Sequence, residues 1–342
     1  MKEKILIVTS VYPPQICGVA DYVYKMMHSK EGKCLELFHT PDWSLQSLFE
    51  KIKQIRNSKA QVINLQYPSA AYGYGIVPHL ICIYFSLFSK KIFSVTIHEY
   101  SQMGWKGRLS NILFLIFANK LIFTNQFELD YAIHINPYIK KKSKIIKIYT
   151  NIKASNDILA IPERKYDVGY FGLIRDNKGL EEFIDVIGEL KRYDPKLIVY
   201  VMGQTQAQLS IHQREILNKL EEIDVILLLN KDENEVASIL ANTKIAYLPF
   251  PDGVSERRGS FLAVVQNRCI VVTTKGPFTI ASHDKICIYT NKENAKDTIL
   301  KTLKMDLSFF ENKQHLIADF IKNDMPKSWD DIILNYKKFL FK

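Results

Sequence analysis

The sequence is poor in the residues that mark unusual classes of protein. Its 342 residues include only 14 Gly and 12 Pro, which excludes a fibrous or mostly disordered chain. Its five Cys are odd in number and scattered without a CxxC pair. This pattern argues against a disulfide scaffold or a cysteine-built zinc site and favours a reducing compartment.

Long apolar runs are absent as well. The longest spans residues 76–89, only 14 positions, and contains His79, so it is too short to cross a bilayer. The N-terminal segment, residues 1–10, turns polar too soon for a signal peptide. We therefore expect a cytoplasmic protein.

Several ligand-binding motifs are also missing. The sequence has no GxGxxG and no GK[ST], which removes the main support for a dinucleotide oxidoreductase or a P-loop ATPase. His98-Glu99 begins like a zinc-protease motif, but position 102 is Gln and the segment does not look helical. No DxD pair of carboxylates occurs. We expect neither a metal nor another cofactor.

Acidic residues are scarce in one half of the chain only. Residues 1–160 contain 20 Lys and Arg against 10 Asp and Glu, whereas residues 161–342 contain 26 of each. An anionic substrate, an anionic membrane surface, nucleic acid or general solubility could each explain the excess. Nucleic acid is not expected as a partner, because no recognisable binding module accompanies the charge.

The hydrophobic pattern predicts two α/β domains in tandem. Short apolar runs at 5–8, 62–65, 92–97 and 121–123 alternate with stretches of helical length, which is typical of a parallel sheet covered by helices. Residues 153–165 are polar and lack a period, so they read as a linker. The alternation then restarts at 168–171. Residues 328–341 predict a terminal helix with one apolar stripe.

The residues that could carry chemistry follow predicted strands. Gly18 opens the first predicted helix, where it would let the backbone approach a ligand. His98 ends an apolar strand and is either a substrate contact or a satisfied structural residue. A further strand ends at Gly172, and Arg175 and Lys178 precede the next helix. These two cations suit a phosphate or pyrophosphate, or they are merely solvated.

A second basic segment lies before another predicted helix. Residues 257–260, Arg257-Arg258-Gly259-Ser260, combine two planar bidentate donors, a glycine and a hydroxyl at a helix start. Together with Arg175 and Lys178, this segment indicates a diphosphate ligand.

The order of these features resembles the two-domain retaining glycosyltransferases of the GT-B type, in particular the large bacterial family 4. The resemblance covers nearly the whole chain and rests on YPPQICGVADY, VTIHEY, GYFGLIRDNKGLEEFI and PFPDGVSERRGSFLAVVQ, the last two being similar to a polysaccharide-assembling bacterial subgroup. It implies two Rossmann-like domains facing a cleft, at 1–152 for the acceptor and 166–325 for the nucleotide sugar. It also implies that residues 326–342 form a helix that crosses back to the first domain.

The resemblance also assigns roles to residues. It implies that Arg175 and Lys178 hold the donor diphosphate and that His98 acts beside them in catalysis. Donor-binding positions would be Gly18, Asn151, Gly172, Arg257, Arg258, Gly259 and Ser260. Acceptor-binding positions would be Asp21, His98 and Glu99. Many family members carry two glutamates eight positions apart, and Ser255 and Ala263 stand there in this sequence, with Glu256 one position off.

The implied function is transfer of a sugar from a nucleotide-diphosphate sugar to a glycan or lipid-linked glycan acceptor in bacterial surface polysaccharide synthesis. The alternative is a catalytically silent protein of the same fold that binds a nucleotide sugar or supports a partner. The basic first half further suggests a position on the inner face of the plasma membrane, with the apolar stretches 80–88 and 112–117 either exposed beside the lysines or buried against the sheet.

Overall fold

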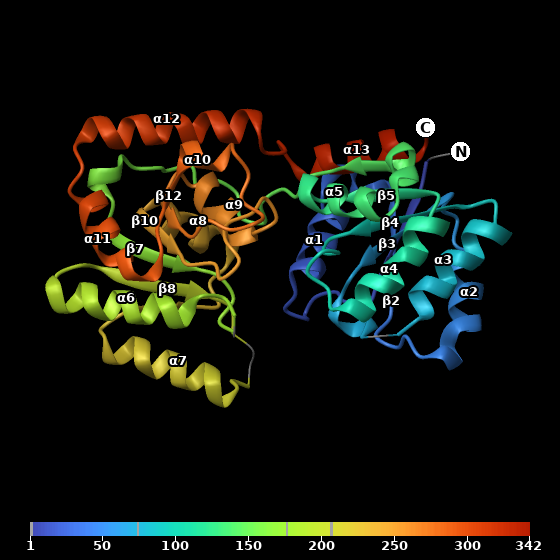
Figure 1. Cartoon of the computed structure of the whole chain (residues 1–342), viewed down its shortest axis with the longest axis horizontal. Helices are drawn as coiled ribbons and strands as arrows, with labels where there is room; N and C mark the ends of the chain where they lie inside the picture. The colour runs from blue at the N-terminus through green and yellow to red at the C-terminus, as the bar shows by residue number, and fades with distance from the viewer. Residues whose placement is uncertain (1–2, 74, 176, 206–207) are drawn as a thin grey trace. The chain divides into compact units, whose positions relative to one another are not determined.

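A computed structural model describes residues 3–73, 75–175, 177–205 and 208–342 (Figure 1). The chain divides into two compact units. Unit 1 comprises Met1–Tyr149 and Pro326–Lys342, and unit 2 comprises Thr150–Met325. Each unit contains a six-stranded sheet in which every pairing is parallel, and helices cover the sheets. The predicted α/β architecture is confirmed.

Unit 1 has the strand order β2-β1-β3-β4-β5-β6. The strands are β1 (Ile5–Thr9), β2 (Leu35–His39), β3 (Val62–Tyr67), β4 (Ile92–Ile97), β5 (Lys120–Phe123) and β6 (Ser143–Ile145). The α-helices are α1 (Gly18–Met27), α2 (Leu48–Asn57), α3 (Val77–Phe88), α4 (Trp105–Phe117), α5 (Gln126–Ile135) and α13 (Trp329–Leu340), and one of the short 3₁₀ helices, η4 (Pro137–Lys142), follows α5.

Both faces of this sheet are buried, and β1 shows how the sequence achieves it. Successive side chains of a strand point to opposite faces. Leu6 and Val8 therefore join the core under α2, α3 and α4, whereas Ile5 and Ile7 join the core under α1 and α13. A parallel strand buried on both faces reads as a near-continuous apolar run, and Ile5–Val8 is such a run.

Helix α13 belongs to unit 1 although it lies at the far end of the sequence. Its apolar stripe, Trp329, Ile332, Ile333, Tyr336 and Leu340, packs into the same core as Ile5, Ile7 and Tyr22. The side chain of Ser328 caps the helix by accepting from the backbone N–H of Asp331. The terminal helix predicted from the apolar stripe thus covers one face of the first sheet (Figure 1).

Unit 2 has the strand order β12-β11-β10-β7-β8-β9. The strands are β7 (Tyr166–Phe171), β8 (Val199–Gly203), β9 (Ile226–Leu229), β10 (Thr243–Leu248), β11 (Ile270–Thr273) and β12 (Cys287–Tyr289). The helices are α6 (Leu180–Tyr193), α7 (Ile211–Glu222), α8 (Glu233–Ala241), α9 (Gly259–Gln266), α10 (His283–Ile286), α11 (Lys292–Leu303) and α12 (Leu307–Asn323).

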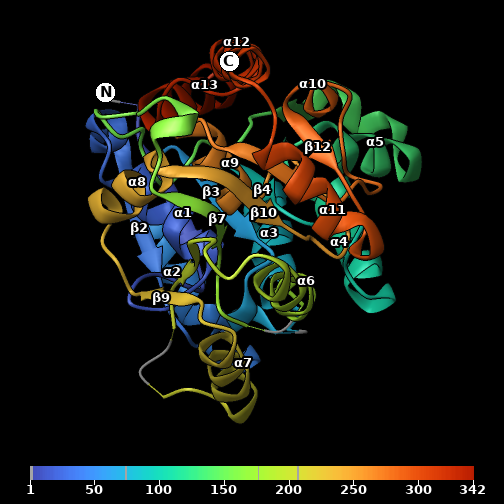
Figure 2. The same cartoon turned by 90° about the vertical axis from the view of Figure 1, so that its left-hand side faces the viewer.

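Helices lie on both faces of the second sheet. Helix α6 packs against α7 and α11 on one face, and α9 packs against α8 and α12 on the other (Figures 1 and 2). Among the described residues, no helix combines the length and the apolarity that crossing a bilayer requires.

Candidate functional site

The strand order of unit 2 places two loops at its switch point. Strand β7 pairs with β8 on one side and with β10 on the other. After β7 the chain therefore continues towards one edge of the sheet, and after β10 it continues towards the other edge. The loops after β7 and β10 both begin at the carboxyl ends of these central strands, and their described residues are 172–175, 177–179 and 249–258. In open parallel sheets, ligands bind at this position.

The loop after β7 brings two predicted donor-binding cations to the start of α6. Arg175 is exposed, Lys178 is half-buried, and α6 begins directly after Gly179. The hydroxyl of Tyr170, on β7, donates to the backbone oxygen of Lys178 at 3.0 Å and so holds the end of the loop. Gly172 lies against the same tyrosine, because a Cβ atom there would come within 3.0 Å of its hydroxyl.

The loop after β10 carries the two adjacent arginines. Arg258 forms an ion pair with Asp252 and lies over the ring of Phe250, 4.8 Å from its centroid. Arg257 lies over a different ring, that of Phe278, at 5.2 Å. The two guanidinium groups therefore diverge, as neighbouring side chains at a helix start do.

The two loops converge on each other. A Cβ atom at Gly179 would lie only 1.9 Å from the backbone oxygen of Pro249, so the loop after β7 touches the loop after β10. Burial raises the pKa of Tyr170, and the positive charges of Arg258 and Arg175 oppose that rise. Both guanidinium groups thus lie within electrostatic range of one hydroxyl at the switch point.

The helices that begin at this point lack side-chain caps. In the described part of unit 2, the N-cap side chains of α7, α8, α11 and α12 each accept a hydrogen bond from a backbone N–H of the first turn, whereas α6, α9 and the short α10 have no such cap. The free N–H groups of a helix start favour an anion. Gly259, in the first turn of α9, has no other heavy atom within 4 Å of where a Cβ would stand. This arrangement suits a phosphate or diphosphate.

In unit 1, the predicted residues lie on the loops after β1 and β4. Gly18 starts α1, and like Gly259 it has open space where a Cβ would stand. Asp21 lies in the first turn of α1. His98 and Glu99 follow β4, with Glu99 exposed and His98 buried.

His98 has protein partners in the structure. Its Nε2 lies 2.9 Å from the side-chain oxygen of Gln66, which can only accept, so Nε2 donates. Its ring meets that of Tyr22 edge to face, with centroids 5.1 Å apart. A contact between His98 and a substrate remains a prediction, and it would have to be made by the part of the ring not held by Gln66.

A strip of buried polar side chains surrounds His98, and sequence reasoning missed it. Register pairs Asn64 with Ser94 and Gln66 with Thr96 across β3 and β4, and His98 continues the same face. The side-chain amide of Asn64 donates to Ser94 at 2.9 Å, and the hydroxyl of Thr96 lies 2.8 Å from that of Tyr336 on α13. The signal was present in the sequence as polar residues at every second position of two apolar strands.

A buried carboxylate holds the loop that carries His98 and Glu99. Glu128, in the first turn of α5, accepts from the backbone N–H groups of Tyr100 and Ser101 at 2.9 and 2.8 Å. It also accepts from the hydroxyl of Ser101 at 2.9 Å. Three hydrogen bonds to one charged group anchor this loop to α5. Glu128 was not singled out from the sequence.

The remaining predicted positions lie near the boundary of unit 2 and in the second basic segment. Asn151 sits in a turn where the hydroxyl of Thr150 bonds to the backbone of Ile152. Ser260 is half-buried in the first turn of α9. Ser255 and Ala263 are buried, and Glu256 is also buried next to Arg257. Neither of the two positions therefore carries a carboxylate, and Glu256, one position away from the first, is the nearest one.

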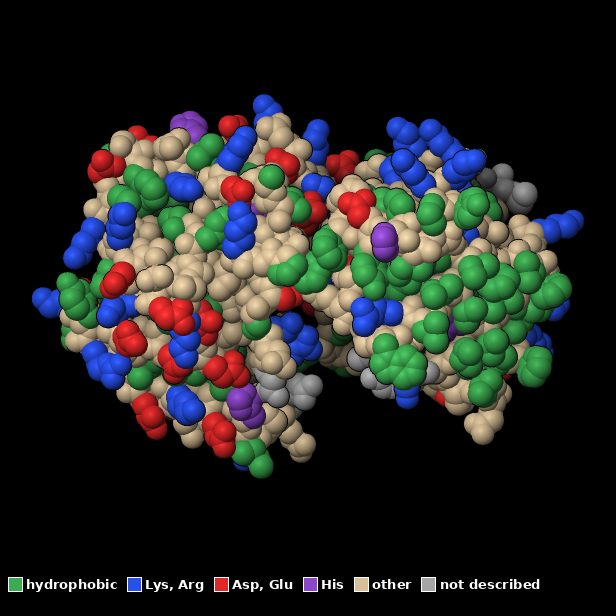
Figure 3. Space-filling model, viewed as in Figure 1, with side chains coloured by type: hydrophobic (Ala, Val, Ile, Leu, Met, Phe, Trp, Pro, Cys, Tyr) green, Lys and Arg blue, Asp and Glu red, His purple; other side chains and the backbone are tan. Residues whose placement is uncertain are grey.

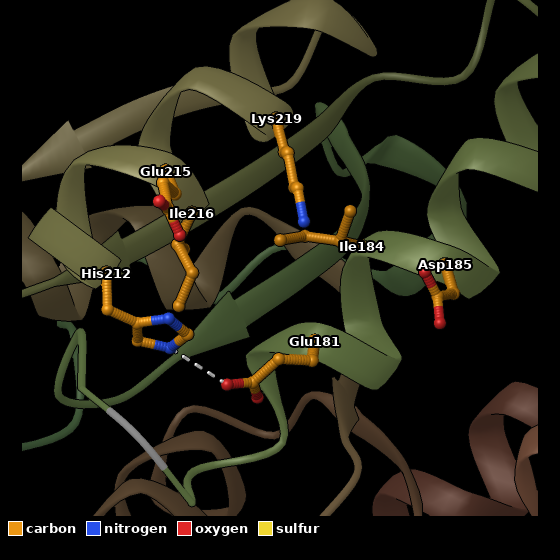
Figure 4. A pocket seen from close by; sticks show the side chains of 7 residues that line it. All are labelled: Glu181, Ile184, Asp185, His212, Glu215, Ile216 and Lys219. Carbon is orange, nitrogen blue, oxygen red and sulfur yellow. Dashed lines mark hydrogen bonds and ion pairs between the residues drawn. The ribbon is translucent and has the colours of Figure 1, made fainter.

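No metal site was found in the described residues, which contain no group of three or more His, Cys, Asp or Glu side chains placed to hold an ion. A small open hollow lies between α6 and α7, where His212 and Glu181 pair at 3.1 Å (Figure 4). Its lining residues are Glu181, Ile184, Asp185, His212, Glu215, Ile216 and Lys219. At about 70 Å³ it is far smaller than a site for a nucleotide sugar.

Solved structures of glycosyltransferases share this arrangement over the whole chain. A glycosyltransferase from Rickettsia africae has a TM-score of 0.68 and 12% identity, and the match covers 99% of both chains. HepE of Anabaena, solved with UDP and glucose, has a TM-score of 0.71 and 12% identity, covering 98% of this chain and 99% of that one. The fold is GT-B.

The GT-B fold also appears in the catalytic domain of starch synthase IV from Arabidopsis thaliana, solved with ADP and acarbose. Its TM-score is 0.63 at 10% identity, and the match covers 100% of this chain and 99% of that domain. No protein-family model and no curated protein matches the sequence. The likeness is therefore one of three-dimensional structure, and it establishes the fold.

Proposed function

We propose that this protein is a glycosyltransferase that takes its sugar from a nucleotide-diphosphate donor. One observation carries the proposal: two uncapped helix N-termini and the cations Arg175, Lys178 and Arg258 converge at the switch point of unit 2. The GT-B fold supports it, because structures of this fold have been solved with UDP and with ADP.

The proposed chemistry assigns unit 2 to the donor and unit 1 to the acceptor. As the bond to the sugar breaks, negative charge grows on the nucleoside diphosphate that leaves. Arg175, Lys178 and the dipole of α6 would stabilise that charge without a metal ion. His98, held by Gln66, would contribute from the acceptor side. Retention of configuration is part of the proposal and rests on the resemblance to family 4.

The proposed acceptor is a glycan or a lipid-linked glycan of bacterial surface polysaccharide synthesis. This part rests on the similarity of FGLIRDNKGLE and DGVSERRGSFLA to the polysaccharide-assembling subgroup. The reaction would take place on the cytoplasmic side, where nucleotide sugars are made.

A catalytically silent nucleotide-sugar-binding protein is the second candidate. It is favoured by Ser255 and Ala263 at the positions of the two family glutamates, since neither side chain carries a charge. Ala263 is buried within α9 and cannot contact a ribose through a polar group. The loop after β10 keeps two other carboxylates, Glu256 and Asp252, and Asp252 pairs with Arg258.

The experiment measures turnover and binding separately. The purified chain is incubated with UDP-, GDP- and dTDP-sugars, and release of the nucleoside diphosphate is followed, while calorimetry measures binding of UDP, GDP and dTDP. We expect slow donor hydrolysis with one base. Binding without any turnover would favour the silent protein, and no binding of any of these nucleotides would overturn both candidates.

Arg175→Ala and Lys178→Ala test the site itself. Each removes a donor whose charge acts mainly in the transition state, so we expect turnover to fall about 10²–10³-fold with the fold intact. Arg192→Ala and Lys196→Ala, exposed cations at the other end of α6, serve as matched controls. Normal turnover in the Arg175 and Lys178 variants would remove these residues from the diphosphate site.

A further inference from the structure

Unit 1 presents a large apolar surface that its own core does not cover. Helices α3 and α4 pack against each other, and each buries one stripe against the sheet, including Phe85 and Phe114. Their outer stripes remain in solvent. We define the α3–α4 face by the exposed side chains Ile76, Leu87, Phe88, Trp105, Leu109 and Ile116. In Figure 3, hydrophobic side chains gather over α3 and α4.

The exposure is too extensive to be incidental. Phe88 is 73% exposed and Trp105 is 67% exposed, and α3 contains no charged residue at all. In α4 the exposed apolar residues recur at positions 105, 109 and 116, one outer stripe of the helix. A contiguous apolar surface of this kind normally marks a partner or a membrane. The sequence left open whether the apolar stretches 80–88 and 112–117 are buried or exposed. In the structure each stretch is buried on the side that faces the sheet and exposed on the other side.

Cations border this face, and acidic residues are nearly absent around it. Residues 51–156 contain fifteen Lys and Arg but only three Asp and Glu. One of those three, Glu128, is buried and bonded to the backbone of Tyr100 and Ser101. Over its two parts, unit 1 holds 23 Lys and Arg against 11 Asp and Glu, whereas unit 2 holds 23 against 25.

Contacts at one end of α4 place part of this charge beside the apolar side chains. Lys142 donates to the backbone oxygens of Ile116 and Ala118 at 2.9 and 2.7 Å, which ties η4 to the end of α4. On η4, Tyr138 is 88% exposed and is followed by the exposed Lys140 and Lys141. An exposed tyrosine next to lysines suits the boundary between lipid headgroups and hydrocarbon.

We propose that the α3–α4 face, with Tyr138, Lys140 and Lys141 at its edge, docks the protein on the surface of an anionic lipid bilayer. The apolar side chains would enter the headgroup region, and the lysines would contact anionic headgroups. A second copy of the chain fits less well, because it would bring together two copies of a unit in which Lys and Arg outnumber Asp and Glu by 23 to 11, and like charges repel. The docking does not depend on the proposed function, although a lipid-linked acceptor would give it a purpose.

The test is co-sedimentation of the full chain with vesicles at low and at high NaCl. Vesicles of phosphatidylcholine alone are compared with vesicles that also contain phosphatidylglycerol. We expect binding to the anionic vesicles that weakens with salt, since salt screens exposed charges. No nucleotide sugar is present, so this result is independent of whether the protein transfers sugars.

Two variants and two matched controls separate the contributions. Lys140→Gln with Lys141→Gln should reduce binding by about fivefold for each lysine. Lys142 is left intact because it caps α4. Lys301→Gln with Lys322→Gln, exposed lysines of unit 2, should leave binding unchanged. Leu87→Gln with Phe88→Gln and Ile116→Gln should abolish most binding, whereas the same change at Tyr193, Ile211 and Leu307 of unit 2 should not.

Three outcomes would overturn the proposal. The first is no binding to anionic vesicles at low salt. The second is equal loss of binding in the α3–α4 variants and their unit 2 controls. The third is absence of vesicle binding together with a dimer in sedimentation velocity that the Leu87, Phe88 and Ile116 substitutions dissociate, which would assign the face to a second copy. Circular dichroism of every variant checks that each is folded.

Discussion

At the scale of single residues, Glu128 shows how a buried charge can hold a loop. Its carboxylate is fully buried and accepts three hydrogen bonds from Tyr100 and Ser101. In Glu128→Gln, an amide N–H group replaces an acceptor, so we expect unfolding in urea to become easier by about 1.5–3 kcal/mol. Asp130→Asn, an exposed change on the same helix, should have almost no effect. Equal effects of the two changes would contradict the anchoring role of Glu128.

A second prediction at the scale of residues concerns His79 and the pH dependence of folding stability. Its ring is buried on α3 and stacks on Phe114, with centroids 4.3 Å apart. Burial lowers the pKa of His79 to about 4 from the usual 6.5, because it disfavours the charged imidazolium. The unfolded chain therefore binds the proton first, and the folded state loses stability as the pH falls from about 6.5 towards about 4.

His79→Phe should remove this part of the acid sensitivity. Between pH 7 and pH 4, the unmodified protein should lose about 3 kcal/mol more of its free energy of unfolding than His79→Phe does, as the lowered pKa of His79 requires. Urea denaturation of both proteins across that range measures the difference. The exposed His134→Phe on α5 is the control. If the stability difference between His79→Phe and the unmodified protein did not change with pH, the buried histidine would not be the acid-sensitive group.

At the scale of elements, the glycines at helix starts fall into two kinds. Gly179 precedes α6 with a φ of +82°, and a Cβ there would lie 1.9 Å from the backbone oxygen of Pro249. Gly259 begins α9 with open space around it. We expect Gly179→Ala to lower the midpoint of thermal unfolding clearly, because it strains both loops of the switch point.

Gly259→Ala should leave thermal unfolding nearly unchanged but weaken binding of a nucleoside diphosphate. The added methyl group would occupy the space through which a phosphate approaches the helix start. Calorimetry with the preferred nucleotide measures the loss, and Gly188→Ala, within α6, is the control. Unchanged affinity in Gly259→Ala would place the phosphate elsewhere.

At the scale of the whole molecule, unit 1 needs α13, from the far end of the sequence, to complete its core. Five side chains of α13 are buried in the core of unit 1. At about 1.5–3 kcal/mol for each large apolar side chain, they contribute about as much as the entire stability of a typical domain. Removal of residues 326–342 should therefore leave unit 1 unfolded or aggregated. Limited proteolysis should then digest residues 1–149 and spare residues 150–325.

A milder change tests the same packing without removing the helix. Tyr336→Phe keeps the ring but loses the hydrogen bonds to Tyr22 and Thr96, so we expect a loss of about 1–2 kcal/mol in the free energy of unfolding. If the chain without residues 326–342 were as resistant to protease as the full chain, α13 would not be needed for the core of unit 1.

The sequence by itself determined the central strands and the helices beside them. Runs such as Ile5–Val8 and Ile245–Leu248 are buried on both faces, so burial alone makes them apolar throughout and recognisable. The edge strands β2, β6 and β12 were not predicted. They have only three to five residues each and are partly exposed, so no clear hydrophobic period marks them.

Only the tertiary structure decided which distant residues meet. Arg175 and Arg258 are 83 positions apart in the sequence. They come together because parallel pairing places β7 beside β10. The polar strip around His98 depends on the register of β3 and β4, and its closure by Tyr336 depends on the return of α13. Strand pairing and helix docking act between segments far apart in the chain, and local sequence patterns do not encode such contacts.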